Sequence, residues 1–595
     1  MTRRFRTVWT AVLALSLSGL SAIGQAPPDE QVTVTAHAFP VPFKSLARTV
    51  EVITREQIEA LPVETVADLI GYAASVEVES RGPFGVQTDF SIRGATFDQV
   101  LILIDGHRLN DPQTGHHNGD IPVALEDVER VEILYGSGSS LHGADAVGGV
   151  INIVTRRSER RTRGEFSVGQ YGLMTGYAGV DLSDTGILES LSLWGNRSSG
   201  FAFDRDFRTL GIRLQGRLGS SGRFQLSHLD KRFGAAGFYG PSPSREWTRQ
   251  TLLALESPVA SGEGWTLSTR ASFRAHRDHF LWDVERPGYA ENFHRDHSMN
   301  AGLGLDWRVA GATRLNLGAT AGGDWIDSNN LGKHRYSRYG VYGEIEQGLG
   351  SRVLLYPGLR YDGSDSFSGS WSPSVSGLVW LTPALKLRSY VGESFRIPTF
   401  TERFYSDPNH QADPSLQPER ALGFEVGLDW LPSPRWRGGL GVFSRHQRDA
   451  IDWIRSDAAE RWRTANIRRL QSEGLEASLQ RRVTSFAWVG VQYTYLNVRA
   501  DELELQSKYV SQYARHSLTT TAAFPLLLGL KVGHHLSYRR RRDGSGYWVA
   551  DLRLTRPVSG SIRLHAEVTN YLNSVYQEIP GVDMPRRWFS VGLEF

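Results

Sequence analysis

The chain has 595 residues, no cysteine, and 66 basic against 64 acidic side chains. The lack of cysteine excludes disulfides, thiolate metal sites and cysteine nucleophiles, and the balanced charge does not point to nucleic acid. From about residue 164 onward, alternating apolar runs separated by Gly, Asp, Ser and Pro replace any long helical pattern. The sequence therefore indicates one large β structure rather than several soluble domains.

The first residues have the pattern of an export signal. Three arginines within the first six residues precede the apolar stretch 8–20, and Ala22 and Gly24 predict cleavage before Gln25. The alternative, a membrane anchor, is disfavoured because the apolar run is shorter than the ~20 residues of a spanning helix. An exported β-rich chain of this kind is either a secreted β domain or an outer-membrane barrel, whose closed sheet satisfies its own backbone hydrogen bonds.

The segment 30–39 that follows the predicted cut is rich in Val and Thr and is followed by Pro40. Both features favour an extended backbone. Two interpretations stay open: an untethered tail, or a strand that pairs with the edge of a partner's sheet.

Residues 45–160 predict a small α/β unit. Thr54 with Gln57, and Thr65 with Asp68, have the spacing of capped helix starts. The uninterrupted apolar run 100–104 is typical of a strand covered on both faces, and a polar loop follows it as far as about residue 120. The unit ends with two strand-like runs that flank a segment dense in glycine.

Alternation is clearest near the end of the chain. In 562–569 and again in the last ten residues, apolar and polar side chains occupy alternate positions. A soluble sandwich would turn the apolar face to its core, whereas a membrane barrel would turn it to lipid. Periodicity alone does not separate these two cases; aromatic residues near the strand ends and the large exported chain favour the barrel.

Several motifs resemble those of the TonB-dependent outer-membrane receptors. SIRG (91–94), LILIDGHRLND (101–111), VERVEIL (128–134) and GADAVGGVINIVTRR (143–157) are similar in order and spacing to the family's plug domain. EQVTVTA (30–36) resembles the TonB box, FRIPTFTERFY (395–405) and DPSLQPER (413–420) resemble barrel motifs, and the terminal Phe595 resembles the signal read by the barrel-assembly machinery.

The resemblance implies a 22-stranded antiparallel transmembrane β-barrel occluded by an N-terminal α/β plug, in the outer membrane of a Gram-negative bacterium. The expected division is a signal peptide (1–24), a TonB box and linker (25–44), a plug (45–160) and a barrel (161–595). The implied function is active transport, with no catalytic residue and no cofactor. The implied partners are TonB with its inner-membrane energising complex, a small-molecule ligand, lipid and lipopolysaccharide, and the assembly machinery; no nucleic acid is expected, and the chain is expected to be a monomer.

Three groups of residues follow from the resemblance. The TonB box comprises Gln31, Val32, Thr33, Val34, Thr35 and Ala36. The ligand contacts expected on the plug loop are Asn110, Asp111, Gln113, His116, His117 and Asn118, with a solvated loop packed against the barrel wall as the alternative. Arg93 is expected to lock the plug to the barrel through Glu393 and Glu476, and Tyr135 stands where the family commonly has a second arginine of this lock.

Histidines suggest a metal site. A symmetric hairpin around residues 286–288 would set His276 opposite His297 and His279 opposite His294, close enough to share a metal, with polar pairs on an extracellular hairpin as the alternative. His410 lies between the two barrel motifs, where haem-receptor members of the family place a ligand histidine.

The polar loop and the length of the chain resemble the cobalamin-receptor branch, so the expected ligand is a corrinoid. A ferric siderophore is the second expectation and haem the third. Two functions of other classes stay open from the sequence, a passive porin and a secreted β-sandwich adhesin.

Overall fold

The computed structural model describes residues 37, 41–157, 162–183, 186–484, 486–500, 505–509 and 513–595, without the side chains of residues 467 and 468. The chain divides into two units, Met1–Glu30 and Gln31–Phe595, and all described residues belong to the second. The predicted export signal and the six TonB-box residues lie outside the described residues. Within the described part, no helix is both long and apolar enough to cross a membrane.

Residues 41–157 form an α/β unit, which we call the plug. Its main sheet has the order β1 (Val50–Thr54), β6 (Val128–Tyr135), β7 (Gly149–Thr155), β4 (Val100–Ile104) and β5 (His107–Arg108). Only the β4–β7 pair in this sheet is parallel. A second sheet pairs β2 (Val76–Ser80) with β3 (Thr88–Ile92). The short helices are α2 (Arg55–Ala60), α3 (Val66–Ile70), α4 (Ser139–His142), η1 (Phe43–Ser45), η2 (Phe97–Gln99), η3 (Gly115–His117) and η4 (Leu125–Asp127).

Local sequence explains these elements. Capping boxes start α2 at Thr54 and α3 at Thr65, as the spacing predicted, because each cap side chain pairs with the backbone three residues on. Strand β4 is buried along its whole length. Ile102 packs into the cluster under α2 and α3, and Leu103 packs into a second cluster on the other face of the sheet. A strand that packs on both faces needs apolar residues at consecutive positions.

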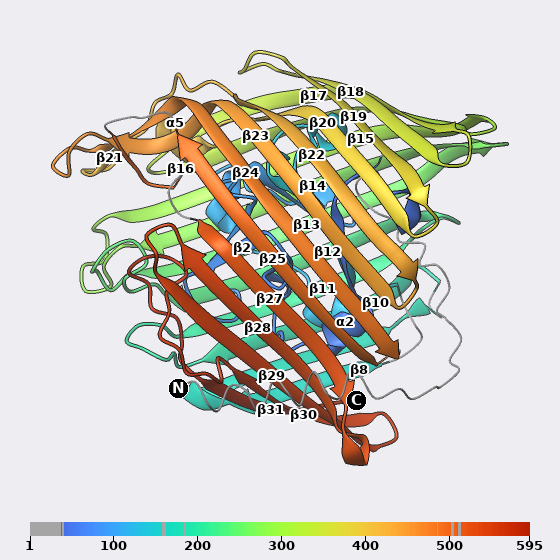
Figure 1. Cartoon of the computed structure of the whole chain (residues 1–595). Helices are drawn as coiled ribbons and strands as arrows, with labels where there is room; N and C mark the ends of the chain where they lie inside the picture. Colours follow the sequence, from blue (N-terminus) through green and yellow to red (C-terminus); the bar gives the residue numbers. More distant parts are fainter. Residues whose placement is uncertain are drawn as a thin grey trace. The chain divides into compact units, whose positions relative to one another are not determined.

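The rest of the chain closes into a barrel of 22 long strands, in which each strand pairs with the next and β31 pairs back with β8. Figure 1 shows β27, β28 and β29 side by side in this wall. The strands are β8 (Arg163–Gly169), β9 (Leu173–Asp181), β10 (Leu188–Ser198), β11 (Phe207–Leu218), β12 (Gly222–Gly234), β13 (Arg245–Gly262), β14 (Trp265–Leu281), β15 (Glu291–Ala310), β16 (Thr313–Ser328), β17 (Gly332–Leu349), β18 (Val353–Ser364), β19 (Ser370–Thr382), β20 (Leu385–Arg396), β22 (Glu419–Ser433), β23 (Trp436–Arg455), β24 (Trp462–Thr484), β25 (Ala487–Ala500), β27 (Ala514–Pro525), β28 (Lys531–Arg541), β29 (Gly546–Ser559), β30 (Ile562–Thr569) and β31 (Trp588–Glu594).

Five short elements of the described residues lie in the connections between barrel strands. They are η5 (Gln170–Gly172), α5 (Phe400–Phe404), η7 (Leu527–Gly529) and the two-residue strands β21 (His410–Gln411) and β26 (Gln506–Ser507), which extend the wall at its edge. Connections at one end of the barrel are short, as at 219–221 and 263–264, whereas those at the other end include 282–290 and 397–418. Short turns face the periplasm and long loops face outward in barrels of this kind.

The barrel wall is apolar on its outer face. In β31, Phe589 and Val591 are exposed while Ser590 is buried, and in β30 Leu564 is exposed while Glu567 is buried. This is the reverse of a soluble sandwich, whose apolar residues point to the core. The alternation therefore belongs to a membrane barrel with a polar interior.

The plug packs against the inside of that wall. Leu252, Trp488 and Ala523 from three barrel strands belong to the same buried cluster as Ile58 and Ile133 of the plug. A second cluster joins plug residues to β18 and β19. Plug and barrel thus share their hydrophobic core, and polar contacts between them decide how the plug is held.

Candidate functional site

The polar loop after β5 folds back on the plug through its two asparagines. The Asn110 amide accepts a hydrogen bond from Ile102 N at 2.8 Å and donates one to Val100 O at 2.9 Å. The Asn118 side chain accepts from Asp111 N at 2.9 Å. Both side chains are buried. They fix the shape of the loop and are not free to contact a ligand in this arrangement.

Three further residues of the loop attach it to barrel strand β14. Asp111 forms an ion pair with Arg274, and its Oδ2 lies 3.0 Å from His276 Nδ1. Gln113 donates to Asp278 at 3.3 Å, and His117 Nε2 lies 3.5 Å from the same carboxylate. The structure therefore brings Asp111, Gln113 and His117 into contact with the wall, and Asn110 and Asn118 into contact with the plug itself.

His116 also contacts the plug, but part of its side chain stays exposed. Its Nδ1 lies 2.8 Å from Asp89 Oδ1, its ring stacks on Phe97 at 4.3 Å, and 13% of its side chain is exposed. Burial alone would raise the pKa of Asp89, but His116 and Arg81 outweigh it and lower that pKa to about 2. The carboxylate is thus a fixed acceptor that orients the His116 ring.

Aromatic residues from two outer connections converge on His116. Tyr239, between β12 and β13, lies 6.4 Å from its ring, and Tyr509, after β26, lies 6.1 Å away and meets Phe97 edge-on at 5.1 Å. We call His116, Phe97, Tyr239 and Tyr509 the aromatic floor. Sequence reasoning missed its two tyrosines because they lie hundreds of residues apart in connections that carry no motif.

Plug residue Arg93 is held by two barrel carboxylates. Its Nε lies 2.8 Å from Glu476 Oε1 on β24, and its Nη1 lies 2.7 Å from Glu425 Oε2 on β22. Glu425 also accepts from Thr49 N at 3.1 Å and pairs with Arg388 of β20. The backbone of Arg93 has φ of 52°, an unusual value for a side chain other than glycine, so the surrounding contacts hold it in place.

Glu393 does not form the ion pair with Arg93 that the resemblance implied. Its side chain is exposed on the outer face of β20, and only its backbone carbonyl faces the plug, accepting from the Ser137 hydroxyl at 3.2 Å. Glu425 stands in its place. The signal was present in the sequence, because Leu422, Phe424 and Val426 mark the lipid face of β22 and leave Glu425 on the inner face.

Tyr135 occupies the position of the family's second lock arginine. Its hydroxyl donates to Glu51 at 2.7 Å, and Glu51 also accepts from Gln492 of β25 at 2.8 Å. Burial, followed by the charge of Glu51, raises the pKa of Tyr135 well above its ordinary value, so the phenol stays neutral. The plug is therefore tied to β25 by a hydrogen-bond chain at the position where the family commonly has an arginine.

A second arginine nevertheless reaches the lock, from residue 48. A side chain at Gly136 would lie 3.4 Å from Arg93 Nη1 and 3.9 Å from Arg48 Nη2, so the two guanidinium groups flank this glycine. Arg48 donates to Ser137 O at 2.6 Å and lies 3.5 Å from the centre of the Tyr390 ring. The second positive charge comes from the segment before β1, which no motif marked.

The predicted histidine pairs do not form. His276 pairs with Asp296 and points inward, whereas His297 pairs with Ala275 and stacks on Phe273 on the outer face. The connection 282–290 sets the register one residue away from the symmetric hairpin, and a one-residue slip moves a side chain to the other face of the sheet. His279 likewise faces Phe293 rather than His294.

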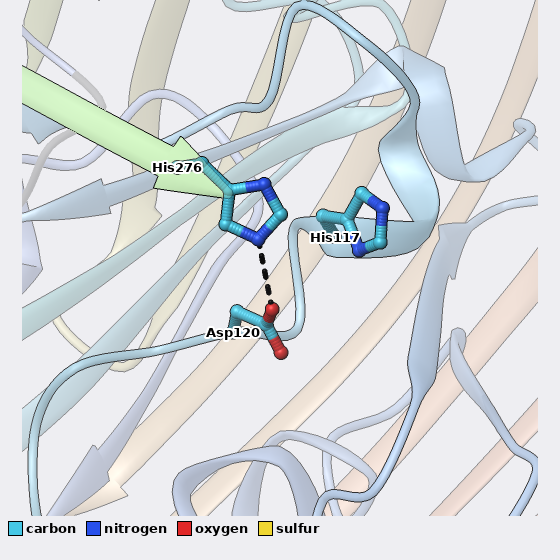
Figure 2. Close-up of side chains that lie close together, drawn as sticks. All are labelled: His117, Asp120 and His276. Carbon is cyan, nitrogen blue, oxygen red and sulfur yellow. Dashed lines mark hydrogen bonds and ion pairs between the residues drawn. The ribbon is translucent and has the colours of Figure 1, made fainter. Parts of the chain in front are cut away.

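His410 lies in the outer loop against Trp453, with ring centres 5.2 Å apart. Its Nδ1 lies 3.0 Å from Asp407, and its Nε2 lies 3.3 Å from Lys508 Nζ. Both ring nitrogens therefore contact protein groups, and in this arrangement neither nitrogen is placed to bind the iron of a haem. His276 instead meets His117 and Asp120 of the plug loop (Figure 2).

A closed barrel with an outer apolar band, filled by an α/β plug that ion pairs hold to its wall, defines a gated outer-membrane receptor. The family model for the TonB-dependent receptor plug domain matches residues 42–150, and that for the TonB-dependent receptor-like β-barrel matches residues 149–571. The chain belongs to the TonB-dependent receptor family. It is a transporter of the Gram-negative outer membrane and not an enzyme.

Two relatives are similar over most of their length. An "Iron-regulated outer membrane virulence protein" of Vibrio cholerae is 23% identical over 95% of each chain, and the "Vitamin B12 transporter BtuB" of Photobacterium profundum is 23% identical over 80% of each chain. Among solved structures, the siderophore receptor PirA from Acinetobacter baumannii has a TM-score of 0.75 at 16% identity, covering 93% of this chain and 98% of that one. The structural likeness concerns the fold.

Proposed function

We propose that the chain imports a corrinoid across the outer membrane, at the expense of energy delivered through TonB. The observation that carries this proposal is the charge at the outer surface of the plug. Four buried arginines there are paired with carboxylates: Arg81 with Asp89, Arg108 with Asp145, Arg338 with Asp324, and Arg396 with Glu402 and Glu419.

Paired arginines leave little net positive charge for a ligand. A ferric catecholate is a polyanion, and its capture needs a surface whose cations are not already neutralised by neighbouring acids. A corrinoid carries little net charge and presents amides and flat apolar surface. The aromatic floor offers flat faces and polar edges of the kind that pack against such a molecule.

The relatives support two ligands. The vitamin B12 transporter of Photobacterium profundum favours the corrinoid. The iron-regulated protein of Vibrio cholerae and the siderophore receptor PirA favour a ferric siderophore, which is the second candidate. Haem is not favoured, because His410 already contacts Asp407 and Lys508 through its two ring nitrogens.

Within the predicted set of loop residues, we assign direct ligand contact to His116. The other five, Asn110, Asp111, Gln113, His117 and Asn118, position the loop. A ligand that packs on the aromatic floor would contact the same loop that is bound to β14. Ligand binding can therefore change the stability of the plug. Such coupling requires that the ligand bind the two plug states with different affinity.

Equilibrium binding to the purified protein tests the proposal. We expect saturable binding of cyanocobalamin and no saturable binding of a ferric catecholate or a ferric hydroxamate. His116→Ala and Tyr239→Ala should each weaken binding about tenfold, the equivalent of ~1.4 kcal/mol. Tyr289→Ala is the matched control, an exposed tyrosine in the connection 282–290. Binding of a siderophore without cyanocobalamin would replace the corrinoid with the second candidate.

A further inference from the structure

A buried group of histidines and carboxylates joins the plug loop to three strands of the wall. We call it the His–Asp cluster. It contains Asp111, His117 and Asp120 of the loop, Glu246 of β13, His276 and Asp278 of β14, and His294 and Asp296 of β15. All eight side chains are buried. The cluster lies between plug and barrel, and it shares no side chain with the aromatic floor that we assign to the transported ligand.

The cluster has more acids than fixed cations. Its five carboxylates face two side chains that are always charged, Arg274 on Asp111 and Asp296, and Lys231 on Asp120. Three of its buried atoms have no hydrogen-bond partner among the described residues, namely Asp278 Oδ1, Glu246 Oε2 and His294 Nδ1. Buried charge of one sign needs compensation, by protons on the histidines or by a bound cation.

Three side chains of the cluster have the spacing of metal ligands. His276 Nε2 lies 3.2 Å from Asp120 Oδ2, and one ligand atom each of His117, Asp120 and His276 lies within 4.8 Å of the others (Figure 2). Two ligands of a tetrahedral zinc ion are about 3.3 Å apart when their bonds are ~2.0–2.1 Å long. His117 and Asp120 also come from one turn, closed by a hydrogen bond from Asp120 N to His117 O at 3.0 Å.

Carboxylates and a lysine contact the three side chains on the sides that face away from the proposed metal. His276 Nδ1 lies 3.0 Å from Asp111 and 3.3 Å from Asp296, and His117 Nε2 lies 3.5 Å from Asp278. Metal-bound histidines commonly present their second ring nitrogen to a carboxylate, which fixes the tautomer and strengthens the ligand. Lys231 Nζ holds the other oxygen of Asp120 at 2.6 Å. Each of the three side chains thus has a partner that orients it.

We propose that His117, Asp120 and His276 bind one divalent transition-metal ion of the Zn²⁺ class. Imidazole nitrogen with one carboxylate suits zinc or its first-row neighbours rather than calcium or magnesium, which prefer oxygen ligands. Two ligands belong to the plug and one to the barrel, so the ion ties the loop to β14. The site uses none of the side chains that we assign to the transported ligand, and its test does not depend on which ligand that is.

Metal content of the purified full chain tests the site. After treatment with a chelator and dialysis against Zn²⁺, the wild type should hold one equivalent more than His276→Gln, as measured by elemental analysis. Calorimetric titration with Zn²⁺ should show a loss of at least about 100-fold in affinity for His276→Gln and Asp120→Asn, and of about 10- to 100-fold for Asp296→Asn, whose side chain lies behind His276.

His279→Gln is the matched control, because this histidine of β14 faces outward and lies outside the cluster. It should bind Zn²⁺ as the wild type does, and heat-modifiable gel migration shows whether each variant has a folded barrel. Zn²⁺ should also raise the urea concentration at which the plug detaches in the wild type but not in His276→Gln. Equal zinc content in the wild type and His276→Gln would overturn the proposal and leave protons as the charge that balances the cluster.

Discussion

Replacement of Glu425 by glutamine is the most direct perturbation of the plug lock. Glu425 of β22 contacts the plug twice, at Arg93 and at Thr49, and also pairs with Arg388 of the wall. Glutamine keeps the shape of the side chain but removes its charge. Two buried guanidinium groups then share the remaining acids, Glu476 beside Arg93 and Asp429 beside Arg388.

Loss of one partner from a buried ion pair costs about 3–5 kcal/mol, because the remaining charge stays buried. Arg93 and Arg388 each keep one carboxylate partner. We therefore expect Glu425→Gln to weaken the docking of the plug by an amount at the lower end of this range, about 3 kcal/mol. Urea midpoints shift by the free-energy change divided by the m-value, and m is roughly 1–3 kcal/mol per molar urea for small domains. The plug should therefore detach at a urea concentration about 1.5 M lower.

The assay follows a fluorophore on the plug during a urea titration of the purified protein. Because the chain has no cysteine, Glu56→Cys on the exposed face of α2 gives a single labelling site. Glu393→Gln is the control, since that side chain faces outward and should leave the midpoint unchanged. An equal midpoint for Glu425→Gln and wild type, with an intact barrel on gels, would refute the assignment of Glu425 as the centre of the lock.

Three further predictions concern the plug and its partner. Deletion of residues 31–36 should abolish uptake and leave ligand binding intact, because the resemblance to the TonB box assigns energy transfer, and not ligand contact, to this segment. Tyr135→Phe should weaken plug docking in the same urea assay by about 1–3 kcal/mol, since Glu51 loses a donor. Burial, with Glu77 and Asp89, raises the pKa of Glu79 to about 8, so its contribution to stability is complete below pH 4.5 and is lost as pH rises to 8. Amide-exchange protection of β2 and β3, corrected for intrinsic rates, should fall across this range in wild type and not in Glu79→Gln.

Each of these predictions has an outcome that contradicts it. Uptake that persists after the deletion would show that energy does not arrive through that segment. A Tyr135→Phe variant with an unchanged midpoint would show that the chain through Glu51 and Gln492 does not hold the plug. Protection of β2 and β3 that stays constant from pH 5 to 8 would show that Glu79 is ionised in the folded protein.

The sequence was informative wherever a local rule decides the structure. Capping boxes at Thr54 and Thr65 are local pairings over three residues, so their spacing alone locates α2 and α3. The apolar run of β4 needs two covered faces, and the sheet supplies them. The plug motifs and the alternation of the last strands led to the family and to the barrel, both of which the comparisons and the fold confirm.

The misplacement of Glu393 and that of the histidine pairs have one physical cause, which is the side of the sheet that a residue faces. Glu393 was expected to contact the plug and His297 to lie opposite His276, but both side chains point outward. Along a strand the facing side changes at every residue, so it depends on the register and on the length of the connections. Apolar residues two positions away show which side of the sheet a residue faces. Val391 does so for Glu393, because both lie on the outer face of β20. A motif considered without these neighbours does not show it.

The position of Glu425 also bears on how a pull on the N-terminal segment would reach the lock. Before β1, the wall holds the chain by the Tyr356 hydroxyl on Ser45 O at 3.0 Å and by Lys386 Nζ on Leu46 O at 3.0 Å, and then by Glu425 on Thr49. A force applied ahead of residue 37 meets these contacts in that order. The third is the first that also holds Arg93, and β1 behind it is an edge strand with a single neighbour, β6. The geometry thus joins the start of the pulled segment to the lock through Arg48 and through Glu425, without passing through the core of the plug.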